Sequence, residues 1–513
     1  MTVQGMAAHA AADPTRVALV LDGEVRTYGA LDERAARLAA ALRSWGVAPG
    51  EPVAVMLPNS FELFEAAFAT AKAQALYLPV NWHLKASEVA WILADSGAKV
   101  LVAEASLAGQ VEEALGDAPA CRVVWVGDGA AGEGDRYEDV LATAPAGGAS
   151  HPDGVEPWPA PNFLFYTSGT TGRPKGVLHG LADGERLAAS MAGIAQMWGF
   201  TPDDVYALAG PAYHAGPGGY AFTSLFAGSR VVIMPKWDAR RFLELVDQER
   251  ISTAFLTPAH FIRILEVPED ERKGYDLSSL RLVLHAGAPC PTPVKRRIME
   301  ALPHAAIWEF YGMSEGPATR ISPEDWQARP GSVGQPWPGI EVRILDADGR
   351  RLSPGEQGVI YVTAPTSRFR YHNDPDKTES AWRDDAFTVG DIGYLDDDGW
   401  LYLTDRATDM VIRDGVNIYP REVEEVLFQH PAVVDCAVFG VPDERRGEQL
   451  KAMVEVREPV TPADLQAHCR ERLADFKCPE LVEVVDSLPR DPNGKVLKRR
   501  LREAHWEGRA SAI

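Results

Sequence analysis

Cysteine is scarce in this sequence, with only five residues among 513. Their number is odd, and no two of them form a C-x-x-C pair. The five are Cys121, Cys290, Cys436, Cys469 and Cys478. This usage excludes a disulfide framework and a cysteine zinc site, and it is typical of a reducing compartment.

Long hydrophobic runs are missing as well, and basic residues are outnumbered. No apolar segment approaches the length of a membrane span, and the Ala-rich residues 1–12 lack the basic and apolar parts of a secretory signal. Lys and Arg number 51 against 73 Asp and Glu, which gives a net charge of −22 and disfavours nucleic acid as a partner. We therefore expect a cytoplasmic protein without stable membrane insertion, either a monomer or a homodimer.

Strand-like and helix-like segments alternate through most of the chain. The apolar patterns predict strands at 53–57, 76–80, 99–102, 205–208, 230–234, 253–256 and 282–284, and helices at 27–45, 61–73 and 87–96. This alternation is typical of parallel βαβ units, and the length predicts more than one domain. Residues 127–160, rich in Gly, Ala, Pro and Asp, are expected to form a loop.

The pattern changes twice towards the C-terminus. Residues 340–363 and 394–403 read as β-hairpins, and beyond residue 405 the pattern is that of a small α+β unit with a helix at 461–474. We predict an α/β protein with a large N-terminal domain, residues 1–405, of βαβ-type sheets and a β-rich subdomain. A small α+β C-terminal domain occupies residues 406–513.

The densest motif is residues 166–177, YTSGTTGRPKGV, which an apolar strand at 163–166 precedes. Glycines let the backbone approach an anion, hydroxyls add donors, and Lys175 adds a mobile charge suited to phosphate. This is a phosphate loop but not the Walker A form, because Pro174 precedes the lysine and Gly176 follows it. The alternative is a surface loop that binds nothing.

Three further segments carry groups that suit a nucleotide. In WEFYGMSEG (308–316), an aromatic ring beside glycine offers a face for a purine, and the glutamate is a hard oxygen ligand of the kind Mg²⁺ prefers. Asp391, on a Gly-flanked turn, can accept ribose hydroxyls or merely cap its own backbone. LPRDPNGKVLKRR (488–500) places Lys495 on a turn, unless it is only a basic tail.

Together these segments resemble the adenylate-forming (ANL) superfamily, and within it the acyl-CoA synthetase and fatty acid–CoA ligase branch. The family loop Y/F-S/T-S-G-S/T-T-G-x-P-K-G is matched throughout, as are Y-G-x-S/T-E at 311–315 and P-R-x-x-x-G-K at 489–495. HAGAP at 285–289 resembles the family's turn along the adenine, although a structural turn is the alternative. The resemblance extends from about Ala10 to Arg502.

The resemblance implies an ATP site, a Mg²⁺ ligand and a lysine that reaches both the substrate carboxylate and the α-phosphate. The implied ATP- and AMP-binding residues are Thr167, Ser168, Gly169, Thr170, Thr171, Gly172, Lys175, Gly287, Ala288, Pro289, Glu309, Tyr311, Gly312, Ser314, Asp391, Arg406 and Lys495. Glu315 is the implied metal ligand. Lys495, Lys175 and His214 are the implied catalytic residues.

PAYHAG (211–216) resembles a family element beside the acyl pocket. His214 is expected to line or gate that pocket and not to act as a base, because an ionised carboxylate is already a nucleophile. The pocket candidates are Tyr213, His214, Gly218, Gly219, Phe222 and Thr257. They are mostly small or apolar and include no acid to hold an ammonium, which favours an apolar fatty, alicyclic or steroid side-chain acid over an amino acid.

In the resembled family the small C-terminal domain is mobile and rotates between two half-reactions. The hinge would be Thr408, where the family has Asp or Lys, and Gly415 and Val416 would lie along CoA. Two further departures are Asp405 for the usual glycine and Val389 for a usual threonine. None of the three removes a group that the chemistry needs.

The resemblance thus implies an ATP-dependent carboxylic acid–CoA ligase that uses Mg²⁺, forms acyl-AMP and releases diphosphate. No carrier-protein domain follows Lys495, which disfavours a peptide-synthetase module. One alternative is an acyl-AMP ligase that loads a separate carrier protein. Another is a nucleotide-binding regulatory protein that has lost catalysis.

Overall fold

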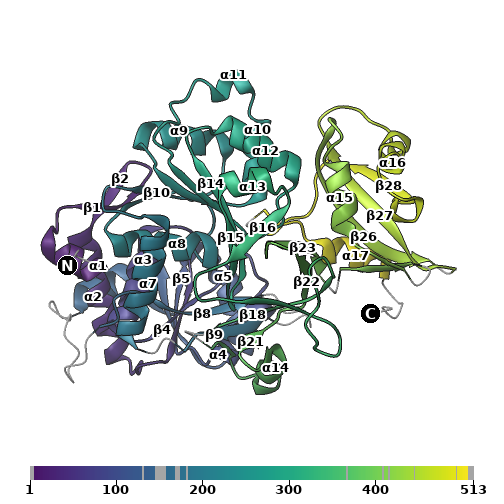
Figure 1. Cartoon of the computed structure of the whole chain (residues 1–513). Helices are drawn as coiled ribbons and strands as arrows, with labels where there is room; N and C mark the ends of the chain where they lie inside the picture. Colours follow the sequence, from purple (N-terminus) through teal and green to yellow (C-terminus); the bar gives the residue numbers. More distant parts are fainter. Residues whose placement is uncertain are drawn as a thin grey trace.

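The computed structural model describes most of the chain, which folds into three sheets surrounded by helices (Figure 1). The described residues are 5–129, 132–144, 157–167, 174–180, 183–364, 368–406, 409–413, 416–443, 445–492 and 494–506; of 405, 406 and 417 only the backbone is described. Within these ranges no helix has both the length and the apolar character needed to cross a lipid bilayer.

An eight-stranded sheet carries the phosphate-loop segment, in the order β19-β9-β8-β4-β3-β5-β6-β7. Strands β3 to β8 run parallel, and β9 and β19 are added antiparallel at one edge. The strands are β3 (Pro52–Met56), β4 (Leu76–Pro79), β5 (Val100–Glu104), β6 (Arg122–Val126), β7 (Asp135–Arg136), β8 (Asn162–Thr167), β9 (Lys175–Leu178) and β19 (Arg370–Tyr371).

A fifteen-stranded sheet joins a parallel part to the β-rich subdomain, in the order β2-β1-β11-β10-β12-β13-β14-β15-β16-β23-β22-β18-β21-β20, with β17 paired to β18. The pairing is parallel from β1 to β14 and antiparallel beyond β14. The strands are β1 (Val17–Leu21), β2 (Glu24–Thr27), β10 (Val205–Leu208), β11 (Arg230–Ile233), β12 (Thr253–Leu256), β13 (Leu282–His285), β14 (Ala306–Met313), β15 (Gly316–Ile321), β16 (Ser332–Pro336), β17 (Val342–Leu345), β18 (Gly358–Thr363), β20 (Trp382–Arg383), β21 (Ala386–Phe387), β22 (Asp391–Leu395) and β23 (Leu401–Arg406).

Helices cover these two sheets and fill two main cores. The first core receives α1 (Met6–Ala12), α2 (Tyr28–Ser44), α3 (Phe61–Lys72), α4 (Ala86–Ser96), α5 (Ala108–Asp117), α6 (Tyr137–Thr143), α7 (Gly184–Trp198) and α8 (Ala215–Ala227). The second receives α9 (Ala239–Glu249), α10 (Pro258–Glu266) and α12 (Thr292–Ala301). The short helices are α11 (Glu269–Arg272), α13 (Pro323–Ala328) and α14 (Pro375–Ala381).

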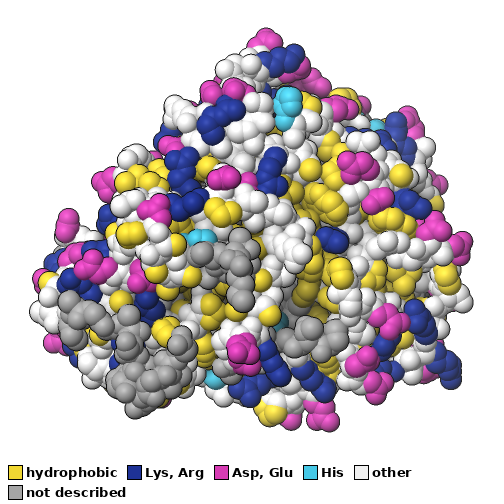
Figure 2. All heavy atoms as spheres, turned by 60° about the vertical axis from the view of Figure 1, so that its left-hand side comes forward, with side chains coloured by type: hydrophobic (Ala, Val, Ile, Leu, Met, Phe, Trp, Pro, Cys, Tyr) yellow, Lys and Arg dark blue, Asp and Glu magenta, His cyan; other side chains and the backbone are white. Residues whose placement is uncertain are grey.

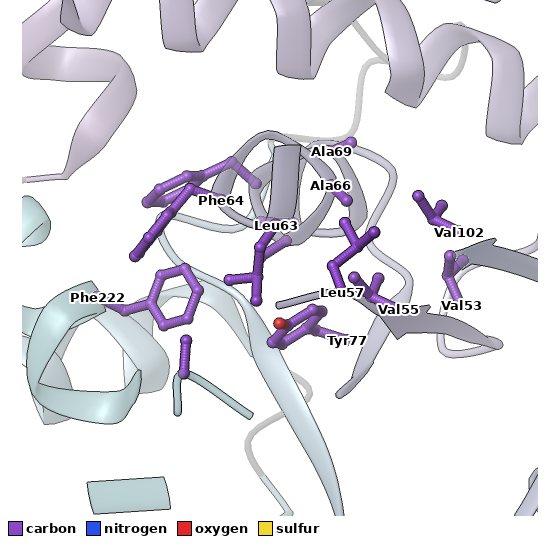
Figure 3. Packing of buried hydrophobic residues seen from close by; sticks show 14 of the residues in the cluster. Val53, Val55, Leu57, Leu63, Phe64, Ala66, Ala69, Tyr77, Val102 and Phe222 are labelled. Atoms are coloured by element: carbon purple, nitrogen blue, oxygen red, sulfur yellow. The ribbon is translucent and has the colours of Figure 1, made fainter. Parts of the chain in front are cut away.

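The start of this domain shows why these residues form these elements. Thr27 and Ser60 cap α2 and α3, each accepting a hydrogen bond from a backbone N–H three residues on. Every residue of β3 is buried, as expected for a parallel strand with helices on both faces. Phe64 of α3, Tyr77 of β4 and Phe222 of α8 meet in the centre of the first core (Figure 3).

The C-terminal residues form a five-stranded sheet with helices, to one side of the larger domain (Figure 1). Its elements are β24 (Val411–Arg413), β25 (Val416–Ile418), α15 (Pro420–Leu427), β26 (Val433–Asp443), β27 (Gly447–Val456), α16 (Pro462–Arg470), β28 (Leu481–Val485) and α17 (Lys498–Trp506). A separate apolar core lies between this sheet and α15 and α16. The predicted fold class is confirmed, and the boundary at residue 405 stays a prediction.

Two local predictions need correction. Residues 127–160 are not all loop, because 137–143 form α6, where the buried Tyr137 donates a hydrogen bond of 3.0 Å to Glu65. That tertiary contact outweighs the turn-rich composition around it. The helix predicted at 461–474 ends at Arg470.

Candidate active site

The phosphate loop connects two antiparallel strands of the eight-stranded sheet. Thr167 ends β8 and Lys175 begins β9, and the two are Cα partners across the ladder. The predicted contacts Ser168, Gly169, Thr170, Thr171 and Gly172 lie outside the described residues. The Thr167 hydroxyl is buried and has no hydrogen-bond partner in the described part of the chain. It can therefore donate a hydrogen bond to an oxygen of a bound phosphate.

Lys175 and Glu315 are brought together by the fold. Ser314 and Glu315 form the two-residue turn between β14 and β15, and Lys175 Nζ lies 2.9 Å from Glu315 Oε1. The hydroxyl of Tyr371 lies 2.7 Å from Lys175 Nζ and 2.8 Å from Glu315 Oε1. Burial and the neighbouring carboxylate of Glu315 raise the pKa of Tyr371, which keeps the phenol protonated as a donor.

The residues present fit a magnesium ion held together with phosphates. Mg²⁺ usually takes one or two protein carboxylates and completes its shell with water and substrate phosphates. Glu315 supplies one such carboxylate, with a side chain only 4% exposed. Among the described residues there is no cluster of three or more His, Cys, Asp or Glu that would hold a metal without a substrate.

The predicted purine and ribose contacts also meet. Tyr311 donates a hydrogen bond of 2.6 Å to Asp391 Oδ2, although 80 residues separate them in sequence. Asp391 begins β22 and is the Cα partner of Arg406 at the end of β23. The side chain of Arg406 is not described. Gly312 follows Tyr311 in β14. A β-carbon at Gly312 would lie 3.1 Å from Cα of Pro317 in β15, so the two strand backbones approach closely at this point.

The turn after β13 has the backbone that HAGAP led us to expect. Gly287 has φ +87°, and a β-carbon there would lie 3.9 Å from Thr257 Cγ2; Ala288 and Pro289 continue the same turn. Glu309 lies on the neighbouring strand, but its carboxylate accepts a hydrogen bond of 3.2 Å from the fully buried Lys295 of α12. That carboxylate is therefore engaged inside the fold, and a nucleotide contact by Glu309 stays a prediction.

His214 stands at the start of α8, in the predicted acyl pocket. Burial lowers the pKa of His214 to about 4, with a smaller effect from His83, so the imidazole is neutral near pH 7. Its Nε2 is buried without a hydrogen-bond partner among the described residues. The neighbouring Tyr213 hydroxyl lies 3.3 Å from His83 Nδ1, a contact that the sequence did not reveal. A neutral imidazole can line a pocket for a carboxylic acid without adding charge.

The other pocket candidates have different surroundings. A β-carbon at Gly219 would meet no atom within 4 Å, whereas one at Gly218 would lie 2.0 Å from the carbonyl oxygen of Ala212. Gly218 is thus needed for close packing, and Gly219 faces open space. Phe222 is fully buried, with Phe64 and Phe163 rings at 5.2 and 5.5 Å, and it has the contacts of a core residue.

Aromatic rings that were missed from the sequence fill the region between α8, β12 and β14. The ring centroid of Tyr220 lies 5.8 Å from that of Phe255 and 5.7 Å from that of Phe310. Phe255 and Phe310 are 6.0 Å apart, and a β-carbon at Gly216 would meet the Phe255 ring at 2.6 Å. This wall is apolar and closely packed.

The turn that carries Lys495 lies against the large domain. A β-carbon at Gly494 would lie 2.6 Å from Cβ of Ala259 and 3.9 Å from Thr257 Oγ1. Burial and the charge of Asp491, from the same turn, raise the pKa of Tyr213. Thr257 thus stands where the turn of Gly287, the start of α10 and the turn of Lys495 meet.

The Lys495 turn is itself well anchored in the C-terminal domain. Arg490 and Val496 form a β-bridge, and the backbone N–H of Lys495 donates to Asp491 Oδ1 at 2.9 Å. Arg490 pairs with Asp435 at 2.6 Å and with Glu455 at 3.0 Å. Lys495 itself is exposed. The turn is therefore anchored within the C-terminal domain by hydrogen bonds and ion pairs.

Comparison with known proteins assigns the family. The family model described as AMP-binding enzyme matches residues 6–371, and the model of the AMP-binding enzyme C-terminal domain matches residues 422–495. This chain belongs to the AMP-binding enzyme family. The predicted adenylate-forming superfamily is thereby confirmed.

Relatives in the family agree along nearly their whole length. The fatty acid–[acyl-carrier-protein] ligase ScoC of Streptomyces coeruleorubidus is 33% identical, over 100% of this chain and 98% of its own. A feruloyl-CoA synthase of an Amycolatopsis species is 36% identical, over 95% and 96%. The crystal structure of ATP-bound MatB from Rhodopseudomonas palustris is 30% identical, over 99% of both chains, with a TM-score of 0.84. The predicted enzyme class, an AMP-forming acid–thiol ligase, is confirmed.

The predicted hinge and CoA segment are only partly visible in this AMP-binding enzyme. Thr408 and Gly415 lie outside the described residues. Val416 begins β25 and is 43% exposed. Arg413, the last described residue before 414–415, is buried and donates a hydrogen bond of 3.0 Å to the carbonyl oxygen of Phe476. In the predicted CoA segment, Arg413 before the undescribed residues is therefore held by a hydrogen bond, whereas Val416 after them is exposed to solvent.

Tyr371 is the main site residue that sequence reasoning missed. It reaches Lys175 because β19 pairs with β9, which places Tyr371 opposite Val177. Its segment has no glycine cluster or charge pattern, and 196 residues separate it from Lys175. No local signal in the sequence could have indicated this contact.

Proposed function

We propose that this enzyme is a carboxylic acid–CoA ligase that converts an acid, ATP and CoA into acyl-CoA, AMP and diphosphate through acyl-AMP. One observation carries the proposal: the turn of Lys495 is docked beside Thr257, at the turn of Gly287 along which adenine is expected. This arrangement supports a role for Lys495 as a cation that one domain delivers to a nucleotide site in the other. ATP and CoA are co-substrates of the reaction.

In the first step the substrate carboxylate attacks the α-phosphate of ATP, and diphosphate leaves. Such a displacement needs in-line positioning and neutralisation of charge, not a general base. Lys495 neutralises charge at the carboxylate and the α-phosphate, Lys175 and the Thr167 hydroxyl serve the departing phosphates, and the neutral His214 lines the acid site. Magnesium, held by Glu315, would add positive charge at the phosphates.

In the second step the thiol of CoA attacks the acyl carbon, and AMP leaves. Lys495 must withdraw to open a path for the thiol. We propose that the C-terminal domain rotates about Thr408 and that Gly415 and Val416 then lie along the pantetheine. In the structure the C-terminal domain is held by polar contacts, such as Arg263 at 3.6 Å from Glu455 and the backbone N–H of Thr292 donating to Glu425 at 3.2 Å, and by Val434, which packs into the second core.

The wall of the acid site supports an apolar substrate. Tyr220, Phe255 and Phe310 bring rings to the space beside α8, and Gly219 leaves room on the same helix. A fatty, alicyclic or steroid side-chain acid fits these apolar rings. Lys and Arg are interspersed with Asp and Glu on the face drawn in Figure 2, and the net charge of −22 disfavours nucleic acid as a partner. We expect the reaction in the cytoplasm.

A screen of carboxylic acids tests the proposal. Diphosphate release is measured with ATP and Mg²⁺, with and without CoA, over fatty, alicyclic, aromatic and steroid side-chain acids. We expect at least one apolar acid to give AMP release that CoA stimulates. The similarity to the carrier-protein ligase ScoC makes a carrier protein the second candidate acceptor, which diphosphate release without any CoA stimulation would favour. No diphosphate with any acid would contradict both.

A further inference from the structure

Helix α4 touches both ends of the phosphate loop. Tyr166, next to the end of β8, donates a hydrogen bond of 2.5 Å from its hydroxyl to Asp95 Oδ2. At the other end of the loop, the carbonyl oxygen of Pro174 accepts a hydrogen bond of 3.1 Å from Trp91 Nε1. Trp91 and Asp95 are four residues apart and therefore share one face of α4. One helix face thus holds both stems of the loop.

The same aspartate is tied to the other side of the loop. Its backbone carbonyl oxygen accepts a hydrogen bond of 2.7 Å from Asn373 Nδ2. Asn373 follows β19, the strand whose Tyr371 contacts Lys175. Asp95 therefore links the strand that enters the loop to the segment that holds the lysine at its exit.

Gly176 shows how closely these parts fit. Tyr166 and Gly176 are Cα partners, and a β-carbon at Gly176 would lie 3.1 Å from Tyr166 Cζ and 2.9 Å from Cβ of His372. The tyrosine ring therefore lies across the glycine, on the face of the hairpin where a side chain at residue 176 would stand. That face is closely packed.

We propose that Asp95 and Trp91 are positioning residues for ATP, which hold the two stems of the phosphate loop so that Thr167 and Lys175, at its two ends, face the triphosphate. The inference rests on the proposed function, because it assumes that this loop binds the triphosphate. A loop whose stems are fixed in advance loses less conformational entropy on binding. Neither residue touches the nucleotide in this account, and both act through the loop.

Calorimetric titration of MgATP into the full-length enzyme tests the proposal without any knowledge of the acid. We expect Asp95→Ala to raise the Kd for MgATP about tenfold, the effect of losing one hydrogen bond to a charged group. Asp95→Asn should recover part of this loss, because its amide oxygen can still accept from Tyr166. Tyr166→Phe and Trp91→Phe should each raise the Kd, and Tyr166→Phe should add little to Asp95→Ala.

Glu88→Ala is the matched control. Glu88 lies on the same helix but accepts a hydrogen bond of 2.9 Å from the backbone N–H of Lys85, away from the loop. It should lower the melting temperature and leave the Kd for MgATP unchanged. Where the acid is known, the Asp95 and Trp91 variants should raise KM for ATP and not KM for the acid.

The outcomes separate this inference from the proposed function. The positioning role would be overturned if the Kd for MgATP were unchanged in the Asp95 and Trp91 variants. It would also be overturned if Glu88→Ala raised the Kd for MgATP as much as they do at the same loss of melting temperature. A wild-type enzyme that binds MgATP but releases no diphosphate with any acid would overturn the proposed function alone. A wild-type enzyme that binds no MgATP would overturn both.

Discussion

The two lysines of the site are held in opposite ways. Lys175 is built into the sheet at the start of β9, has a side chain 18% exposed, and contacts Glu315 and Tyr371. Lys495 is exposed, on a turn that belongs to a different domain. In the proposed reaction, the charge of Lys175 is present whatever the C-terminal domain does, and that of Lys495 arrives only when the domain docks. The proposed withdrawal of Lys495 between the two half-reactions agrees with its place on a separate domain.

The largest expected effect is that of Lys495→Ala. Formation of acyl-AMP should fall about 100- to 1000-fold, because one preorganised charge at the transition state is lost. Thioester formation from preformed acyl-AMP should be spared. Diphosphate exchange and acyl transfer to CoA measure the two steps separately. Arg499→Ala, which removes an exposed ion pair with Glu503, is the control, and equal loss in both steps would refute the role of Lys495.

Lys175→Met should have the next largest effect, and a different one. We expect about a 100-fold fall in kcat/KM for ATP, because a fixed charge at the phosphates is lost. Glu315 also loses its ion-pair partner, so the melting temperature should fall as well, measured by differential scanning calorimetry. Lys495→Ala should leave the melting temperature nearly unchanged. If Lys175→Met and Lys495→Ala lower the melting temperature equally, Lys175 is no more a part of the folded core than Lys495, and the comparison between the two lysines fails.

Gly494→Ala tests the docking contact directly. Its φ of +84° disfavours any side chain, and the new β-carbon would press on Ala259, so acyl-AMP formation should fall about tenfold. Gly399→Ala is the matched control, with φ +80° but no atom near its β-carbon. It should lower stability and leave acyl-AMP formation unchanged. Similar rates of acyl-AMP formation in Gly494→Ala and Gly399→Ala would show that the contact of the Lys495 turn with Ala259 is not needed for catalysis.

The smallest effect concerns pH. The pKa of His214 is lowered to about 4 by burial, so its charge does not change between pH 8 and 6, and His214 should add no step to the rate over that range. Below about pH 6.5 the unfolded chain binds a proton that folded His214 does not, so the free energy of unfolding should fall as pH decreases towards 4. Urea unfolding at pH 7 and 4.5 measures this, and His214→Asn should flatten the difference. A rise in stability on acidification that His214→Asn abolishes would contradict the neutral imidazole.

Some site residues could be predicted from short motifs in the sequence, whereas others could not. The phosphate loop, Tyr311, Asp391 and Lys495 could be predicted because each sits in a short motif that resembles the adenylate-forming family, and their roles stay predictions. Tyr371 was missed, because its role comes from the pairing of β19 with β9. Phe222 and Gly218 looked like pocket residues by position, but their neighbours are the core and a backbone carbonyl.

The sequence by itself determined the family, the alternation of strands and helices and the groups that a nucleotide needs, because these are local patterns of residue type. Only the tertiary structure decided that Glu315 faces Lys175, that Asp95 reaches Tyr166 and that Gly494 lies on Ala259. Such contacts join segments far apart in the chain. Strand pairing and domain docking select them, and no short stretch of sequence encodes either.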